Sequence, residues 1–194
     1  MLVVQGVLSG VLDEAESSAL LYLHCDFASQ LESSGMVEWA IYVLLHLPAN
    51  EENKSCRERA IKSLLSRHAE DWADTERENF LLNELLIPRK WLQEAKAELA
   101  GYSRQWEEML ECLLASDIWS RAHELLMVNV APSAFVEGKH ADLQRFIGLL
   151  KPHADELQNW VIGGRLLDDY YSIMESFSGA AELVAADLVT PTQV

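Results

Sequence analysis

The sequence predicts an all-α protein, an irregular stack of antiparallel helices. All five Pro residues and most Gly residues separate apolar-periodic segments of roughly ten to twenty residues, as expected where helices start and stop. Almost no segment alternates apolar and polar residues as a half-buried strand does, and no Asn-Gly or Asp-Gly hairpin dipeptide occurs. No 34-residue period recurs, so we expect a stack without repeated units.

The first two predicted helices cover residues 13–33 and 36–47. Asp13 begins the first helix, and apolar residues recur along it at spacings of three and four. This apolar stripe consists of Leu20, Leu23, Phe27 and Leu31. Residues 36–47 are apolar on almost every side and end before Pro48, so we expect a central helix that is enclosed by others.

Two further helices are predicted at residues 50–69 and 76–86. Asn50 can cap the first of them, and Thr75 with Glu78 forms a capping box for the second. The expected buried stripe of the helix at 50–69 consists of Cys56, Ala60, Leu64 and His68.

Pro88 is expected to begin the next helix, because a proline at the first helical position loses no intrahelical hydrogen bond. Ser103 and Ser116 can cap helices at residues 104–115 and 117–130. Since the connections are short, these helices and the one before Pro88 should stack as antiparallel neighbours.

The C-terminal part of the chain predicts shorter helices. Their expected ranges are 132–137, 140–151, 154–162, 165–177 and 179–188, followed by a frayed tail at 189–194. We expect a single helical domain over residues 1–194. The apolar segment from Met1 to Leu12 indicates a fragment of a longer protein.

The charge of the chain favours a protein partner. Its 194 residues carry a formal net charge of -16, with 31 Asp and Glu against 15 Lys and Arg. Such an acidic surface repels nucleic-acid phosphates and anionic membranes, so direct nucleic-acid binding is not expected. Residues 1–53 hold eight carboxylates and no Lys or Arg, and residues 54–104 are the only part able to offer a basic surface.

Two further features indicate the cellular environment. The longest nearly apolar run, from Trp39 to Leu47, is too short to span a bilayer, so membrane insertion is not expected. Cys25, Cys56 and Cys112 are widely spaced, which predicts reduced thiols in the cytosol or nucleus.

No catalytic or metal-binding pattern stands out. His24 and Cys25 are adjacent, so on a helix they point about 100° apart, and no third ligand lies three or four residues away. No His-Glu-x-x-His, Gly-x-Ser-x-Gly or Gly-rich phosphate loop occurs. We expect no enzyme activity, cofactor, metal or small-molecule substrate; an α-helical enzyme that uses carboxylates or a metal is the alternative.

The C-terminal aromatic residues predict a partner interface. Apolar residues from Trp160 to Phe177 offer more surface than one helix face can hide, and Tyr170 and Tyr171 cannot both point to the same core. The candidate interface residues are Trp160, Leu167, Tyr170, Tyr171, Met174 and Phe177. The six Trp residues, one per helix or turn, are otherwise expected to anchor contacts between neighbouring helices.

Two sequence segments, taken together, form a specific motif. Residues 87–97 read Ile-Pro-Arg-Lys-Trp-Leu-Gln-Glu-Ala-Lys-Ala, and residues 115–125 read Ala-Ser-Asp-Ile-Trp-Ser-Arg-Ala-His-Glu-Leu. Together they resemble the C-terminal helical domain of the nucleoporin 96 family, whose fungal form is nucleoporin 145C. The resemblance covers about residues 40–178. Ala122 stands where Cys is expected and Ser120 where Asn is common, and both changes preserve a small side chain.

The resemblance implies the tail module of an ancestral coat element, a C-terminal fragment of a longer scaffold protein. Such a module belongs to the Y-shaped scaffold complex of the nuclear pore, at the nuclear envelope. There it would bind the C-terminal helical regions of other Y-complex nucleoporins at the hub, as a hetero-oligomer, and so support transport of protein and mRNA. A helical adaptor subunit of a vesicle coat or signalling complex is the alternative.

Five residues of the matched segments are expected to be structural: Pro88, Trp91, Ala95, Trp119 and His123. Pro88 sets a helix start, and the Trp91 indole lies one turn later, against the preceding helix. Trp119 and His123 lie four residues apart and should point at the same neighbour. Interfaces are therefore expected on the N-terminal helices and the C-terminal aromatics.

Overall fold

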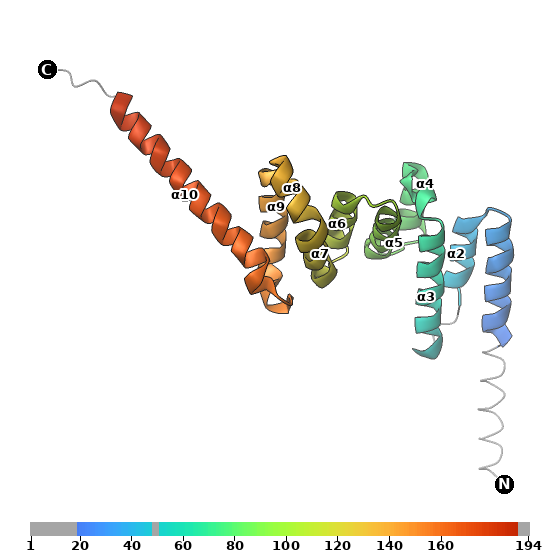
Figure 1. Ribbon diagram of the computed structural model, residues 1–194. Helices are drawn as coiled ribbons and strands as arrows, with labels where there is room; N and C mark the ends of the chain where they lie inside the picture. Colours follow the sequence, from blue (N-terminus) through green and yellow to red (C-terminus); the bar gives the residue numbers. More distant parts are fainter. Residues whose placement is uncertain (1–18, 48–50, 190–194) are drawn as a thin grey trace, which may run out of the picture. The chain divides into compact units, whose positions relative to one another are not determined.

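The computed structural model describes residues 19–47 and 51–189, with side chains for 19–47 and 54–177. Every regular element in these ranges is helical, and none of the described residues lies in a strand (Figure 1). The all-α prediction is therefore confirmed. Among the described residues, no helix is both long and apolar enough to cross a bilayer.

The chain divides into two compact units, with the boundary in the sequence between Ser103 and Arg104. Each unit is described by itself below. The expectation of a single domain stays a prediction.

Unit 1 contains the elements up to Ser103. Its first helix includes residues 19–33. The remaining elements are α2 (Val37–Leu45), α3 (Glu51–Arg67), the 3-10 helix η1 (Ala69–Ala73), α4 (Thr75–Asn79), the π-helix η2 (Phe80–Glu84) and α5 (Arg89–Tyr102).

The core of unit 1 forms where α3 packs against α2 and α5. Trp72 of η1 is fully buried, and its indole Nε1–H donates a hydrogen bond of 2.8 Å to the carbonyl oxygen of Leu65. A buried indole needs such an acceptor, because a lone buried N–H is costly. Trp72 therefore fixes η1 onto the end of α3.

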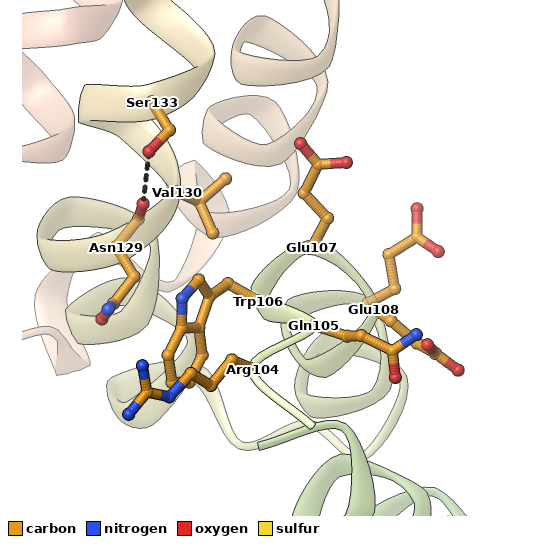
Figure 2. A pocket seen from close by; sticks show the side chains of 9 residues that line it. Arg104, Gln105, Trp106, Glu107, Glu108, Asn129, Val130 and Ser133 are labelled. Carbon is orange, nitrogen blue, oxygen red and sulfur yellow. Dashed lines mark hydrogen bonds between the residues drawn. The ribbon is translucent and has the colours of Figure 1, made fainter. Parts of the chain in front are cut away.

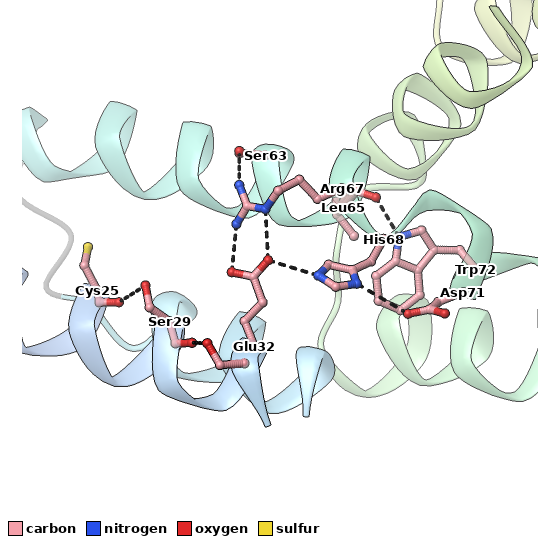
Figure 3. A network of polar contacts seen from close by, with 10 residues as sticks. Cys25, Ser29, Glu32, Ser63, Leu65, Arg67, His68, Asp71 and Trp72 are labelled. Atoms are coloured by element: carbon pink, nitrogen blue, oxygen red, sulfur yellow. Dashed lines mark hydrogen bonds and ion pairs between the residues drawn. The ribbon is translucent and has the colours of Figure 1, made fainter. Parts of the chain in front are cut away.

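A polar network holds the first helix to α3. Figure 3 shows the carboxylate of Glu32 reaching from the first helix toward Arg67 and His68. Arg67 donates two hydrogen bonds of 2.9 Å to the two oxygens of Glu32, and His68 Nε2 lies 3.0 Å from Glu32 Oε1. The hydrogen bond from Arg67 lowers the pKa of Glu32 below its ordinary value.

Unit 2 begins at Arg104 and consists of six α- or π-helical and two 3-10 elements among its described residues. They are α6 (Trp106–Ala115), α7 (Trp119–Leu125), the π-helix η3 (Leu126–Val130), α8 (Ala131–Glu137), α9 (His140–Leu150), the 3-10 helices η4 (Lys151–Glu156) and η5 (Trp160–Ile162), and α10 (Gly164–Val189). Its core side chains include Leu110, Leu113, Leu126, Leu143, Ile147 and Leu150.

The helix caps differ from those predicted. The carboxylate of Asp74 accepts a 2.9 Å hydrogen bond from the backbone N–H of Glu76, so Asp74 caps α4 in place of Thr75. Ser103 and Ser116 end helices instead of starting them, since each occupies the C-cap position. The Ser116 hydroxyl donates to the carbonyl oxygen of Cys112, four residues earlier. The prediction for Asn50 lies outside the described residues.

Two predicted C-terminal boundaries are wrong. The expected helix at 154–162 is two short 3-10 turns, interrupted at Asn159, whose φ of 61° is left-handed. The expected helices at 165–177 and 179–188 form the single helix α10, because Gly179 lowers helix propensity without ending the helix. The beginning of the helix expected from residue 13 and the tail beyond residue 189 lie outside the described residues.

The burial of three helices also differs from the prediction. Most of the expected stripe of the first helix is exposed, while Ala28 on another side is buried and Leu21 and Cys25 are half-buried. In α3, Cys56 is exposed, and the buried positions are Ile61, Leu64 and Leu65. Helix α2 buries Val37, Ala40, Ile41 and Leu44, but its other side is open. The first helix and α2 each have apolar residues on two sides, so periodicity alone did not identify the buried one.

Candidate functional site

Helix α10 is held to its own unit along one face. This helix packs against α9 and η5. Tyr171 is 7% exposed, and its hydroxyl lies 3.0 Å from His140 Nδ1. Asp168 pairs with Lys151 at 2.8 Å, and Gln144 of α9 donates a 2.9 Å hydrogen bond to Glu175. Burial raises the pKa of Tyr171, in agreement with a packed position.

The opposite face of α10 is apolar and exposed. We define the α10 surface as Leu166, Tyr170, Ile173, Met174 and Phe177, all of which are exposed, Phe177 to 70%. Four of these residues follow spacings of four, three and four, which place them on one helix stripe. The exposed stripe of α10 is therefore apolar along its length.

Helix α8 extends the α10 surface. The ring centroid of Phe135 lies 5.6 Å from that of Tyr170, and Phe135 is itself exposed. Its neighbour Val136 is even more exposed. An exposed group of large apolar side chains of this kind is typical of a protein interface.

The candidate interface residues predicted from the sequence fall into two sets. Tyr170, Met174 and Phe177 belong to the α10 surface. Trp160 and Tyr171 are buried and Leu167 is half-buried, so these three pack within unit 2. The candidate set omitted Leu166, Ile173, Phe135 and Val136. The spacing of three and four around Tyr170 identifies the first two of these.

The structural residues of the first matched segment lie in unit 1. Ala95 is buried in α5, and Pro88 is the exposed N-cap residue of that helix. Trp91 is half-buried, with the Lys62 Nζ of α3 5.4 Å from its ring centroid. Trp91 also packs against the hydrophobic core of unit 1, and its expected contact with the preceding helix stays a prediction.

Trp119 and His123, the structural residues of the second segment, contact residues of 151–162. Trp119 stacks on His153, with ring centroids 3.9 Å apart and an interplanar angle of 12°. The His123 ring lies 5.5 Å from that of Trp160. Burial lowers the pKa of His123, and its buried Nε2 has no hydrogen-bond partner.

Unit 2 also contains open pockets. The one in Figure 2 has a volume of about 530 Å³ and lies between the start of α6 and η3. The side chains of Arg104 and Trp106 lie beside each other there, facing Asn129. Glu107 on its wall is paired with Lys139 at 2.8 Å. Within the described part of the chain, no three His, Cys, Asp or Glu side chains gather as a metal site would require.

Comparison with known proteins identifies relatives of this chain. The sequence model of a family described as Nuclear protein 96 matches residues 4–98. The chain is 30% identical over 166 residues to the nuclear pore complex protein NUP96 of Arabidopsis thaliana, covering 86% of this chain and 16% of that protein. It is 32% identical over 169 residues to the nuclear pore complex protein Nup98-Nup96 of Dictyostelium discoideum, covering 82% and 8%. Nucleoporin nup189 of Schizosaccharomyces pombe is 32% identical over 178 residues, covering 89% and 10%.

The match extends further upstream than the resemblance predicted from motifs, since it begins at residue 4 instead of about residue 40. It includes the segment 87–97 and ends close to the boundary of unit 1. The chain spans less than a fifth of the length of the relatives named above. From the family match and these relatives together, the chain belongs to the nucleoporin 96 family.

Proposed function

We propose that this chain is a structural part of the nuclear pore complex that binds other helical nucleoporins through the α10 surface. Its relatives are named as nuclear pore complex proteins. We infer further that the partners are the C-terminal helical regions of Y-complex nucleoporins at the hub. The chain would support transport of protein and mRNA by holding its neighbours in place, a role that needs no catalysis.

The observation that carries the proposal is the two-sidedness of α10. One face is fixed to its unit by Tyr171 and Asp168, and the other presents five apolar side chains to solvent. A helix with apolar residues on both sides is typical of a position between two packed layers.

The size of the α10 surface determines how much additional contact area a stable complex needs. Covering the exposed parts of the five side chains of the α10 surface should contribute about 5 kcal/mol to the binding free energy. This figure takes about half of the full burial value for each side chain. Association itself costs about 4 kcal/mol or more, so a stable complex needs additional area. Phe135, which lies against Tyr170, extends the apolar area. A stable contact is expected to bury about 1,000 Å² or more in total.

The test is binding of the full chain to recombinant C-terminal helical regions of Y-complex nucleoporins, followed by gel filtration and calorimetry. The double substitution Ile173→Gln and Phe177→Gln is expected to weaken binding about a hundredfold, because it places two amides where apolar side chains are covered. Circular dichroism should show an unchanged fold, since both side chains are exposed.

Val161→Gln provides the matched control, because Val161 is an exposed apolar residue of the same unit outside the α10 surface. It should leave the affinity unchanged. Equal affinity of the double variant and the unaltered chain would reject the α10 surface. Co-purification with vesicle-coat subunits in place of nucleoporins would favour the adaptor alternative.

A further inference from the structure

Four aromatic rings form a continuous row on the surface of unit 1, far in sequence from α10. The Trp39 ring centroid lies 5.8 Å from that of Tyr42 and 6.4 Å from that of Phe80 in η2. Tyr42 in turn lies 4.2 Å from His46. We call Trp39, Tyr42, His46 and Phe80 the aromatic row.

The row lies on the open side of α2. Trp39 is 53% exposed and Tyr42 is 41% exposed, whereas Ala40 and Ile41 between them are fully buried. The row therefore faces away from the core of unit 1. Trp and Tyr are the residues most enriched at binding hot spots, because each covers a large area with few rotatable bonds.

Two exposed carboxylates share the helix face of Phe80, at one end of the row. Glu84 and Glu76 lie four residues after and four residues before Phe80, and both are exposed. Within the described part of the chain, neither of these two glutamates forms an ion pair. Glu38, next to Trp39, is already paired with Arg77. Residues 1–53 contain no Lys or Arg, so the segment that carries α2 has no cation of its own.

Other Trp residues of the unit already have a cation against the ring. The guanidinium carbon of Arg77 lies 5.4 Å from the Trp72 ring centroid, and Lys62 lies at the same distance from Trp91. Within the described residues, no such cation lies over Trp39 or Tyr42. Trp39 contacts Phe80, whose helix carries Glu76 and Glu84 on the same face, so a cation would be attracted by both the ring quadrupole and the negative charge.

We propose that the aromatic row binds an arginine-bearing segment of another protein, with guanidinium groups stacked on Trp39 and Tyr42 and paired with Glu76 or Glu84. Arginine fits better than lysine, because its planar guanidinium stacks on a ring and still donates hydrogen bonds to a carboxylate at its edge. The net charge of -16 opposes nucleic acid as the occupant. This site is separate from the α10 surface, so either can fail without the other.

The test titrates the full chain with a short arginine-rich peptide and with the same peptide carrying citrulline at every arginine. Citrulline keeps the shape of the side chain and removes the charge. Binding is followed by calorimetry and by the indole N–H resonances in nitrogen-15 NMR spectra. The arginine peptide is expected to bind at least about tenfold more tightly than the citrulline peptide, and to shift the Trp39 resonance.

Variants of the chain distinguish binding at the aromatic row from attraction by the overall negative charge. Trp39→Leu combined with Tyr42→Leu should weaken arginine-peptide binding about tenfold. Tyr102→Leu removes a tyrosine of the same unit that is even more exposed but lies outside the aromatic row, and it should have no effect. Glu84→Gln should weaken binding more than Glu98→Gln, an exposed carboxylate on α5.

Three outcomes would overturn the proposal. They are equal affinity for the citrulline peptide, unchanged affinity of the Trp39 and Tyr42 double variant, and equal losses for the two glutamate variants. The third outcome would mean that the peptide responds only to the overall negative charge. Circular dichroism of each variant verifies that the helices are intact.

Discussion

Replacing Trp72 with Phe should destabilise unit 1 strongly, although the substitution keeps an aromatic ring. Trp72 is fully buried, and its indole N–H donates to the Leu65 carbonyl oxygen at 2.8 Å. Losing this donor leaves a buried carbonyl without one partner, at a cost of about 1–3 kcal/mol. The missing part of the indole leaves a void that adds about 1 kcal/mol. The expected total is about 3 kcal/mol, a large share of the net stability of a domain.

Urea unfolding followed by far-UV circular dichroism measures this change. With a slope of about 2 kcal/mol per molar urea, the midpoint should fall by about 1.5 M. Trp39→Phe is the control, because that indole is half exposed, and its effect should stay below about 0.5 kcal/mol. Equal effects of the two substitutions would refute the assignment of Trp72 as the anchor between η1 and α3.

Three further predictions follow from the geometry. Because the hydrogen bond from Arg67 lowers the pKa of Glu32 below its ordinary value of 4.5, the stability this pair provides should be present at neutral pH and lost as pH falls through the lowered pKa; Glu32→Gln should therefore have a lower urea midpoint than the unaltered chain at pH 7, and the difference should disappear in acid. Gly164→Ala should lower the melting temperature, at a cost of about 1–3 kcal/mol, because its Cβ would lie 2.1 Å from Trp160 Cζ3; an unchanged melting curve would contradict this packing. Gly138→Ala should cost about 1 kcal/mol in urea unfolding although the space around it is open, since its φ of 76° is left-handed.

Helix positions could be predicted from the sequence because proline residues mark several of the helix ends. Pro48 and Pro88 separate the helices of unit 1, and the structure has helices ending and beginning near both. Capping was harder to predict. Asp74 and Thr75 are both good cap residues, and only the backbone geometry shows that Asp74 accepts the hydrogen bond from Glu76.

The buried side of a helix could not be predicted where two sides are apolar. In the first helix, Leu23 and Phe27 follow the period of a core stripe, yet they are exposed while Ala28 is buried. The same limit affected the candidate site. The sequence did not show which of Tyr170 and Tyr171 is buried: the rings lie 5.2 Å apart, and Tyr171 is the buried one, with its hydroxyl against His140.

The most direct test of the central claim is hydrogen exchange of the full chain, alone and bound to a helical scaffold nucleoporin. The account predicts slower exchange on binding in the peptide that covers Leu166–Phe177 and in the one that contains Phe135, while the peptides of unit 1 exchange as before. A partner that binds tightly while exchange along α10 stays unchanged would contradict it.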